Sequence, residues 1–411
     1  FKYLAGGQTR AVDLYSLAGA DTPDPTIAGL LGEIRQSTTT TGFLEPLTDP
    51  NYERFTFINT GSQQRYFPTV RLDFNLTSKL HLENIYNYNK FGGTVDFLNG
   101  VDPRYPGFPN KGSQVSNRFS NVTALRWTVS NAIVNEARFG LTGGTVLFFP
   151  EVNVGQFANQ GGYNINIGAA GITSATATTT TSRRNAPVWQ FNDTVNWTRG
   201  SHNLNFGFNF SQINFWSSAV AGGAVRTLTL GIASGDPAEA LFNTTNFPGA
   251  TPTQLNQARA LYATLTGRMT AVSGTLSLDE ESLRYRLNDN FTQRTRQREI
   301  GFFGQDSWRA TPNLTLNYGL RWEVQLPFIA QNEVYTQIPY SDLFGISGEG
   351  NIFKPGTLTG RVPQYTQFRQ GDTPFSIDKN ALAPSFGFAW SPNFNKGPGK
   401  WILGEGGRGV V

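Results

Sequence analysis

Residues 300–323, IGFFGQDSWRATPNLTLNYGLRWE, carry an alternation of apolar and polar side chains that limits the chain to a few folds. Their second half is apolar at every second position, the period of a β-strand with one apolar and one polar face. Residues 311–313 are typical of a tight turn, because their proline presets φ and their asparagine tolerates the left-handed region. Trp308 and Trp322 mark the ends of the two strands. Strands of about ten residues with terminal aromatic side chains are typical of a transmembrane β-hairpin.

The same pattern recurs along the chain. We expect hairpins near residues 65–91, 117–148, 188–216, 298–324 and 383–411, joined by long connections. An aromatic residue precedes each short turn by three positions: Phe74, Trp127, Trp197, Trp308 and Trp390. Short turns, long loops and aromatic girdles are features of outer-membrane barrels, whereas propellers and sandwiches need no such asymmetry. The sequence therefore predicts an all-β, antiparallel up-and-down transmembrane β-barrel segment of about ten strands, with the five aromatic residues in one interfacial belt.

The composition agrees with strands and turns rather than helices. Only 15% of the residues are charged, and Gly, Thr, Asn and aromatic residues are abundant. No run approaches the roughly 18 consecutive apolar residues of a transmembrane helix, which excludes a helical membrane protein. A barrel stays possible because its strands alternate.

The connections between hairpins are expected to be extracellular loops that contain short helices. Residues 1–64 are interpreted as a loop-rich N-terminal segment, and residues 65–411 as the partial barrel. Asp24 and Pro25 are expected to begin a short helix as N-cap and first helical residue. Thr251 and Gln254 resemble a capping box, which predicts a second helix in the longest connection.

Several function classes find no support in the sequence. The absence of cysteine excludes disulfides, thiolate catalysis and cysteine-based zinc sites. The net charge of +4 is small for 411 residues, and nucleic-acid binding is not expected. Residues 404–409 match GxGxxG literally, but a dinucleotide site needs a following helix within a βαβ unit, so we expect no cofactor.

The two histidines, His81 and His202, support neither a metal site nor a catalytic site. His81 and Glu83 could share one strand face, but two ligands do not make a metal site. Two histidines near short turns do not support a Ser/His/Asp triad either. We therefore predict that the protein binds no metal and is not an enzyme.

The polar faces of the expected strands carry eight charged residues of both signs, which we predict to face the lumen. An arginine or lysine that faced lipid would cost roughly 2–4 kcal/mol at the membrane midplane. In the lumen these groups can pair with each other, contact a plug or contact the substrate. They are Arg71, Asp73, Glu83, Arg126, Glu136, Arg138, Arg321 and Glu323.

Asp193 and Asp306 do not fit this division, because they share the strand parity of Trp197 and Trp308. A lipid-facing orientation follows from that parity. Two explanations are open: a bulge that resets the phase of the strand, or a position near the membrane interface.

Five segments together resemble the barrel of TonB-dependent outer-membrane receptors, specifically the Oar-like branch. They are RYFPTVRLDFNLTSKLHLE, WTVSNAIVNEARFGLT, DTVNWTRGSHNLNFGFNF, GFFGQDSWRATPNLTLNYGLRWE and APSFGFAWSP. The resemblance covers the chain from about Tyr52 onward and implies the outer membrane of a Gram-negative bacterium. It also implies contact with membrane lipid, with a plug domain and, through the plug, with TonB.

The sequence departs from that family in what it lacks. It contains no recognisable TonB box, plug domain or carboxypeptidase-regulatory-like N-terminal domain, and KWILGEGGRGVV looks like a strand cut off midway. Transporters of this kind close with about 22 strands around a plugged lumen. We therefore interpret the sequence as a fragment of a larger barrel.

The leading hypothesis is the barrel portion of a TonB-dependent receptor that imports an unidentified ligand. The alternative is a structural or adhesive outer-membrane barrel without active transport, and a soluble β-rich binding protein is a third class. Residues 217–297 are the expected location of ligand or partner specificity, because binding residues concentrate on loops carried by a rigid scaffold.

Overall fold

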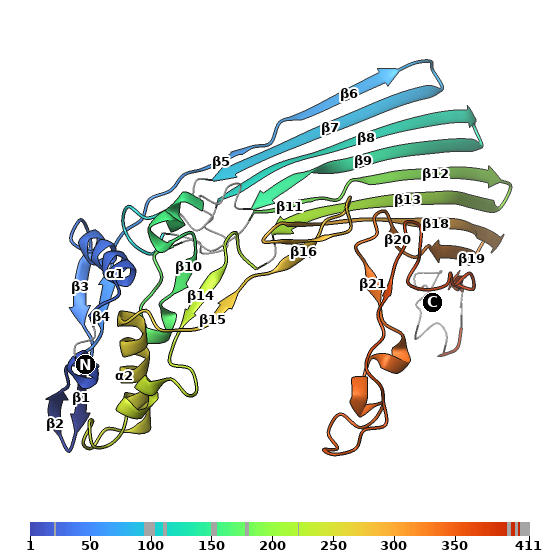
Figure 1. Cartoon of the computed structure of the whole chain (residues 1–411). Coiled ribbons are helices and arrows are strands. Elements are labelled where there is room, and N and C mark those ends of the chain that lie inside the picture. Colours follow the sequence, from blue (N-terminus) through green and yellow to red (C-terminus); the bar gives the residue numbers. More distant parts are fainter. Residues whose placement is uncertain are drawn as a thin grey trace.

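One large antiparallel sheet dominates the computed structural model (Figure 1). The structure describes residues 1–19, 22–93, 103–109, 113–148, 154–176, 181–220, 222–392, 396–398 and 402. Among these residues, no helix is both long enough and apolar enough to cross a membrane. The all-β, antiparallel fold class expected from the alternation is confirmed.

The large sheet contains twelve strands, and three of its positions are filled by two strands in line. These positions hold β5 with β6, β11 with β12, and β19 with β20. The bounds are β5 Gln63–Tyr66, β6 Thr69–Asn75, β7 Leu80–Gly93, β8 Gln114–Ser130, β9 Ile133–Phe148, β11 Ser182–Asn185, β12 Val188–Arg199, β13 His202–Val220, β18 Asn290–Thr311, β19 Leu314–Gln325, β20 Ile329–Ala330 and β23 Leu382–Trp390.

Proline accounts for the three interruptions. Pro68 stands between β5 and β6, Pro187 between β11 and β12, and Pro327 between β19 and β20. Proline has no backbone N–H to donate to the ladder, so strand pairing stops there. The carbonyl groups of Pro68 and Pro187 still accept from the neighbouring strands, at 3.0 Å from Tyr88 N and from Asn214 N.

The short turns lie where the sequence predicts them. They comprise residues 76–79, 131–132, 200–201 and 312–313, and they sit at one end of the strands in Figure 1. The long connections leave from the opposite ends of those strands. The first strand of the hairpin expected at 383–411 is β23, whereas most of its second strand lies outside the described residues.

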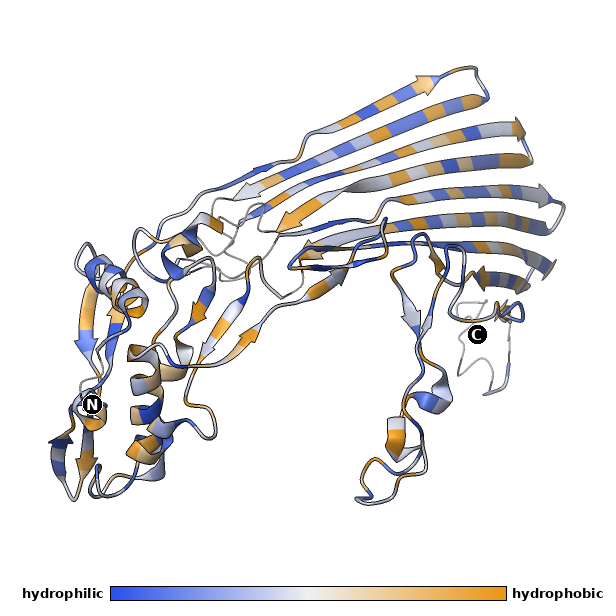
Figure 2. Cartoon of the chain, viewed as in Figure 1, coloured by the Kyte–Doolittle hydropathy of each residue, from blue (hydrophilic) through white to orange (hydrophobic). Residues whose placement is uncertain are grey.

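The sheet has an apolar face and a polar face, visible as alternating bands along each strand in Figure 2. We call the face that bears Phe74, Phe206 and Leu320 the apolar face, and these side chains are 48%, 44% and 50% exposed. The opposite face, which bears Arg71 and Glu136, is the polar face. A row of half-exposed apolar side chains across so many strands needs an apolar environment to cover it.

The connections fold into small elements at the long-loop end of the sheet. Residues 1–64, which we expected to be loop-rich with one short helix, contain that helix and two short hairpins within their described part. The elements are β1 Lys2–Ala5, β2 Gln8–Ala11, η1 Ser16–Ala18, α1 Pro25–Ser37, β3 Phe43–Pro46, β4 Glu53–Thr56, η2 Val154–Gln160, β10 Asn164–Asn166, η3 Gly168–Ala170, β14 Thr227–Leu230, η4 Pro237–Leu241, α2 Pro252–Leu265, β15 Met269–Ser273, β16 Leu276–Leu278, β17 Tyr285–Leu287, β21 Thr336–Gln337, η5 Tyr340–Asp342, η6 Gly345–Ser347 and β22 Thr366–Gln367.

Both predicted helices form, with the expected N-caps. The carboxylate of Asp24 accepts from the backbone N–H groups of Thr26 and Ile27, and Thr251 forms a reciprocal capping box with Gln254. The apolar stripe of α1 packs into a cluster with Tyr105, and α2 contributes Tyr262 to a second cluster that also contains residues near the N-terminus. The connections therefore have small hydrophobic cores of their own.

Polar contacts tie two long connections to the end of β18. Arg294 donates to both carboxylate oxygens of Glu280 at 2.7 and 2.9 Å. Asn332, from the following connection, donates to the same carboxylate and to the carbonyl of Thr292, both at 2.9 Å. The hydrogen bonds and the ion pair to Arg294, led by the side-chain hydrogen bond, lower the pKa of Glu280. Glu280 and Asn332 thus hold residues 222–289 and 326–381 against the sheet.

Two glycines of β9 differ in how closely the neighbouring strand approaches them, and substituting each one tests the packing of the sheet. Gly144 has φ +122°, and an added Cβ would lie 1.9 Å from the carbonyl oxygen of Asn117. Gly140 lies in the same strand, but its Cβ would meet nothing closer than 3.7 Å. We expect Gly144→Ala to lower the free energy of unfolding by about 2 kcal/mol or more, because the backbone must shift. Gly140→Ala should change it by no more than about 0.5 kcal/mol.

Urea unfolding of the protein in lipid vesicles, followed by tryptophan fluorescence, measures both values. Equal midpoints for the two variants would contradict the register assigned to β8 and β9.

Candidate functional site

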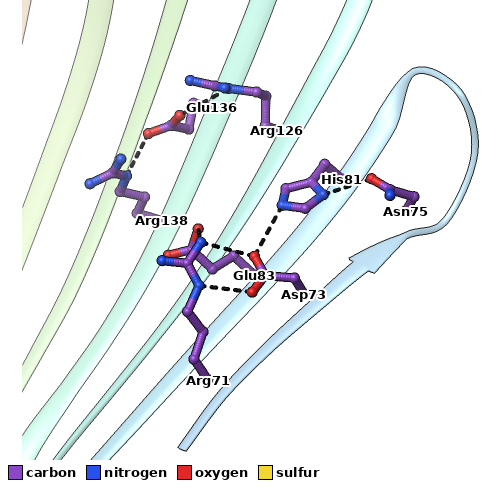
Figure 3. Close-up of polar contacts among 8 residues, drawn as sticks. All are labelled: Arg71, Asp73, Asn75, His81, Glu83, Arg126, Glu136 and Arg138. Carbon is purple, nitrogen blue, oxygen red and sulfur yellow. Dashed lines mark hydrogen bonds and ion pairs between the residues drawn. The ribbon is translucent and has the colours of Figure 1, made fainter.

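The first group of charged residues lies on β6 and β7 and is drawn in Figure 3. Arg71 donates to both carboxylate oxygens of Asp73, at 2.8 and 3.0 Å, and to Glu83 at 3.0 Å. His81 contacts the side-chain oxygen of Asn75 at 3.0 Å and lies 3.5 Å from the Asp73 carboxylate. One guanidinium therefore balances two carboxylates.

A second group follows on β8 and β9, where Glu136 lies between two arginines. Its carboxylate is 3.4 Å from Arg126 and accepts from Arg138 at 2.5 Å. Glu136 is the less exposed partner, with a side chain 24% exposed against 63% for Arg126. This group has a net positive charge, whereas the group around Arg71 has a net negative charge when His81 is neutral.

The remaining two predicted residues, Arg321 and Glu323, lie far along the sheet on β19. Arg321 is paired with Glu323 and donates to the side-chain oxygen of Asn209 at 3.4 Å. Each of the eight predicted residues thus has an ion-pair partner on the polar face. The structure brings six of them together on β6–β9 and leaves two apart.

The structure adds a third residue to the pair that the sequence suggested as metal ligands. Asp73, His81 and Glu83 each offer a ligand atom, and these atoms lie within 4.8 Å of one another. Asp73 was not considered because it joins the other two only through the pairing of β6 with β7. Arg71 already holds both carboxylates, so the contacts describe an ion-pair cluster.

A hollow of about 460 Å³ on the polar face is a feature that the sequence analysis did not identify. Uncharged amide side chains dominate its lining, and the side chain of Asn205 donates to that of Asn196 at 2.9 Å. These amides come from β12, β13, β18 and β19, and only the register aligns them. They are Asn196, Asn203, Asn205, Gln305 and Asn317.

The five aromatic residues predicted to form a belt are staggered in a regular way. Phe74, for example, pairs with Leu82, which pairs with Leu125, two residues before Trp127. For each aromatic residue, the cross-strand partners lead in the same way to a position two residues before the next aromatic residue, which lies nearer its short turn. The five are Phe74, Trp127, Trp197, Trp308 and Trp390.

This stagger has a geometric consequence. A step of two residues from one hairpin to the next equals one residue for each strand. Along the strand axis this is a shift of about 3.3 Å between neighbouring strands, which lie about 4.8 Å apart. A line through the five residues is therefore inclined by about 35° to the hydrogen-bonding direction. Strands of membrane barrels tilt by about 35–45°, so one depth for these residues is compatible with this register.

The two misfit aspartates face the apolar side, and no bulge explains them. The pairing of β12 and of β13 with their neighbours runs without interruption past Asp193 and Asp306. The register shifts in this part of the sheet lie nearer the turns, between Thr128 and Ser130 and between Arg309 and Thr311. The first of the two explanations from the sequence is therefore wrong.

Cross-strand partners accommodate both carboxylates. Asp306 has a side chain only 5% exposed, and it contacts His202 at 2.6 Å and accepts from the hydroxyl of Tyr318 at 2.7 Å. The ring of His202 stacks on Trp308. Asp193 accepts from Asn135 at 2.7 Å. His202 and Tyr318 were missed because each belongs to a different strand from Asp306.

A family of membrane barrels matches most of the chain. The family described as "Outer membrane beta barrel domain" matches residues 19–408. The copper transporter OprC has 9% identity and a TM-score of 0.38, over 80% of this chain and 35% of that one. The siderophore receptor PiuA from Acinetobacter baumannii has 12% identity and a TM-score of 0.36, over 82% and 41%.

The ferric-catecholate import receptor Fiu from E. coli K12, in its open form, has 12% identity and a TM-score of 0.32, over 80% of this chain and 44% of that one. The chain thus spans less than half the length of these three solved structures. A search of curated proteins gave no match. Because the TM-scores are low, the family match alone carries the assignment.

Asp306 provides a test of the polar cluster on the apolar face. We expect Asp306→Ala to lower the free energy of unfolding by about 1–3 kcal/mol, because His202 and Tyr318 lose their acceptor. Asp306→Asn keeps one carbonyl acceptor and should lose less. Urea unfolding in lipid vesicles measures both variants, and an alanine variant as stable as the parent would show that the three side chains do not act together.

Proposed function

Since the chain belongs to the outer membrane β-barrel domain family and lies in the bacterial outer membrane, we propose that it forms part of the wall of a TonB-dependent receptor. In this proposal the receptor imports a ligand through a plugged barrel. The observation that carries it is the two-faced sheet, apolar on one side and lined with ion pairs on the other. The resemblance of five segments to TonB-dependent receptors of the Oar-like branch is the second support.

The polar face lines the lumen in this proposal. Arg71, Arg126 and Arg138 are more than half exposed, so each keeps contact with water while it pairs with a carboxylate. An arginine in lipid would instead cost roughly 2–4 kcal/mol at the midplane. The charged groups on β6–β9 and the amide-lined hollow on β12–β19 would then meet the plug or a passing ligand.

The long connections face the exterior, and the short turns face the periplasm, as in other barrels of this architecture. Residues 222–289 remain a candidate for ligand contact, because they carry α2 and share a hydrophobic core with residues near the N-terminus. Contact with a plug and with TonB rests on the resemblance of the sequence segments. An adhesive barrel would use the same external loops without a need for TonB.

Introduced cysteines test this topology directly, since the chain contains no native cysteine. Ser282→Cys, in an external loop, should react with a membrane-impermeant maleimide on intact cells. Ser201→Cys, in a short turn, should react only after the outer membrane is permeabilised. Arg321→Cys and Leu320→Cys should differ in their rate of labelling as well. A cysteine at 321 faces the lumen and should react with a charged thiol reagent, whereas a cysteine at 320 is protected by lipid. Equal labelling of these two neighbours would contradict a two-faced wall.

Energised import is tested by nutrient depletion. The full-length gene is expressed or deleted in cells with and without TonB, and the loss of compounds from a defined medium is measured by mass spectrometry. We expect at least one compound whose depletion requires both proteins. Normal depletion in every strain, together with weaker surface attachment in the deletion strain, would favour the adhesive alternative.

A further inference from the structure

A groove of about 580 Å³ lies among the small elements at the long-loop end of the sheet. Its walls are α1, the β3–β4 hairpin, residues 104–105 and residues 171–173. The helix and the hairpin lie near the N-terminus in Figure 1. This volume falls within the range of about 300–1,000 Å³ that is usual for small-molecule sites. No pattern in the sequence predicts binding residues here.

Aromatic rings form a fixed apolar wall of the groove. Tyr105 is buried and stacks on Phe55 with ring centroids 6.2 Å apart. Its hydroxyl donates to the carbonyl of Thr173 at 3.1 Å. Tyr52 donates to the carbonyl of Ala170 at 3.2 Å, and its ring packs so closely on Gly171 that an added Cβ would lie 2.6 Å from it. Both phenol groups are already bonded, so these two residues line the groove mainly with ring carbon atoms.

The charge of the groove is positive. Arg35, Arg54 and Arg104 line it with a single acid, Glu53. Glu53 is paired with Arg35 at 2.8 Å. Arg54 and Arg104 are exposed, and within the described part of the chain neither has a carboxylate at ion-pair distance. Glu45 stands opposite Arg54 in the hairpin, but it does not line the groove.

A neighbouring hollow on α1, of about 380 Å³, is lined by one aromatic ring, Phe108, and by no arginine. Glu33 is its single charged lining residue, and the carboxylate of Glu33 already accepts from Asn159 at 3.1 Å. The combination of aromatic rings with two exposed arginines distinguishes the larger groove.

We propose that this groove binds a small ligand in which a flat apolar ring carries an anionic group, either a carboxylate or a phosphate. The ring would pack on the wall formed by Tyr105 and Phe55, as aromatic pairs do. The anion would accept hydrogen bonds from Arg54 and Arg104, since guanidinium groups bind planar and tetrahedral oxyanions through several donors. A cation would meet the excess of arginine, and a neutral ring would leave the arginines without a partner. The site needs access from solution and does not depend on import.

Phenyl phosphate and benzoate are suitable probes, with benzyl alcohol as the neutral analogue and inorganic phosphate as the anion without a ring. Binding to the purified full-length protein in detergent is measured by saturation-transfer NMR and calorimetry. We expect phenyl phosphate to bind more tightly than either inorganic phosphate or benzyl alcohol. Arg54→Gln and Arg104→Gln should each weaken its binding by about tenfold, because a hydrogen bond to a charged group is lost.

Arg284→Gln is the matched control, since Arg284 is an exposed arginine of another loop and does not line the groove. It should leave the affinity unchanged, and unfolding curves should be the same for all three variants. The proposal is overturned if benzyl alcohol binds as tightly as phenyl phosphate, if the two groove variants keep the parent affinity, or if neither anion binds at millimolar concentration. Uptake is not measured, so this outcome and the outcome of the TonB experiment are independent.

Discussion

The cross-strand register from β6 to β23, which shifts only near two of the short turns, is the constraint on which the rest of the structure depends. Successive side chains of a strand point to opposite faces, so a slip of one residue would exchange the faces of a whole strand. The register here keeps apolar side chains in rows on one face and arginines beside carboxylates on the other. Between the outermost strands β6 and β23, which pair on one side only, each strand position has pairing partners on both sides, as strands in a membrane require.

Within that register, several charged groups of the sheet have partners on the same strand or on an adjacent strand. On the polar face, Glu136 holds two arginines, and Arg71 holds two carboxylates. On the apolar face, Asp306 lies between His202 and Tyr318, each from a different strand. A buried carboxylate without such partners would be costly, so the apolar face accepts Asp306 only because the pairing of β13, β18 and β19 supplies donors.

The loops follow a different principle from the sheet. Their small hydrophobic clusters combine segments far apart in the sequence, as when α1 packs with Tyr105 and with residues of β10 and β14. Such clusters hold loops in defined positions above a scaffold, the arrangement in which binding residues are usually found. The arginine-lined groove and the Glu280–Arg294–Asn332 contact both depend on this assembly.

The sequence by itself determined the fold class, the hairpins, the short turns, both helix caps and the polar side of each strand, because alternation and turn chemistry are local. Alternation alone therefore assigns Arg71, Glu136 and Arg321 to one face. Only the tertiary structure decided which charged groups pair, that Asp193 and Asp306 stay on the apolar face without a bulge, and that Arg54 and Arg104 share one groove. Apart from charge pairs two residues apart on one strand, such as Arg321 with Glu323, those outcomes depend on register and on loop packing, which join residues distant in the sequence and leave no periodic signal in the chain.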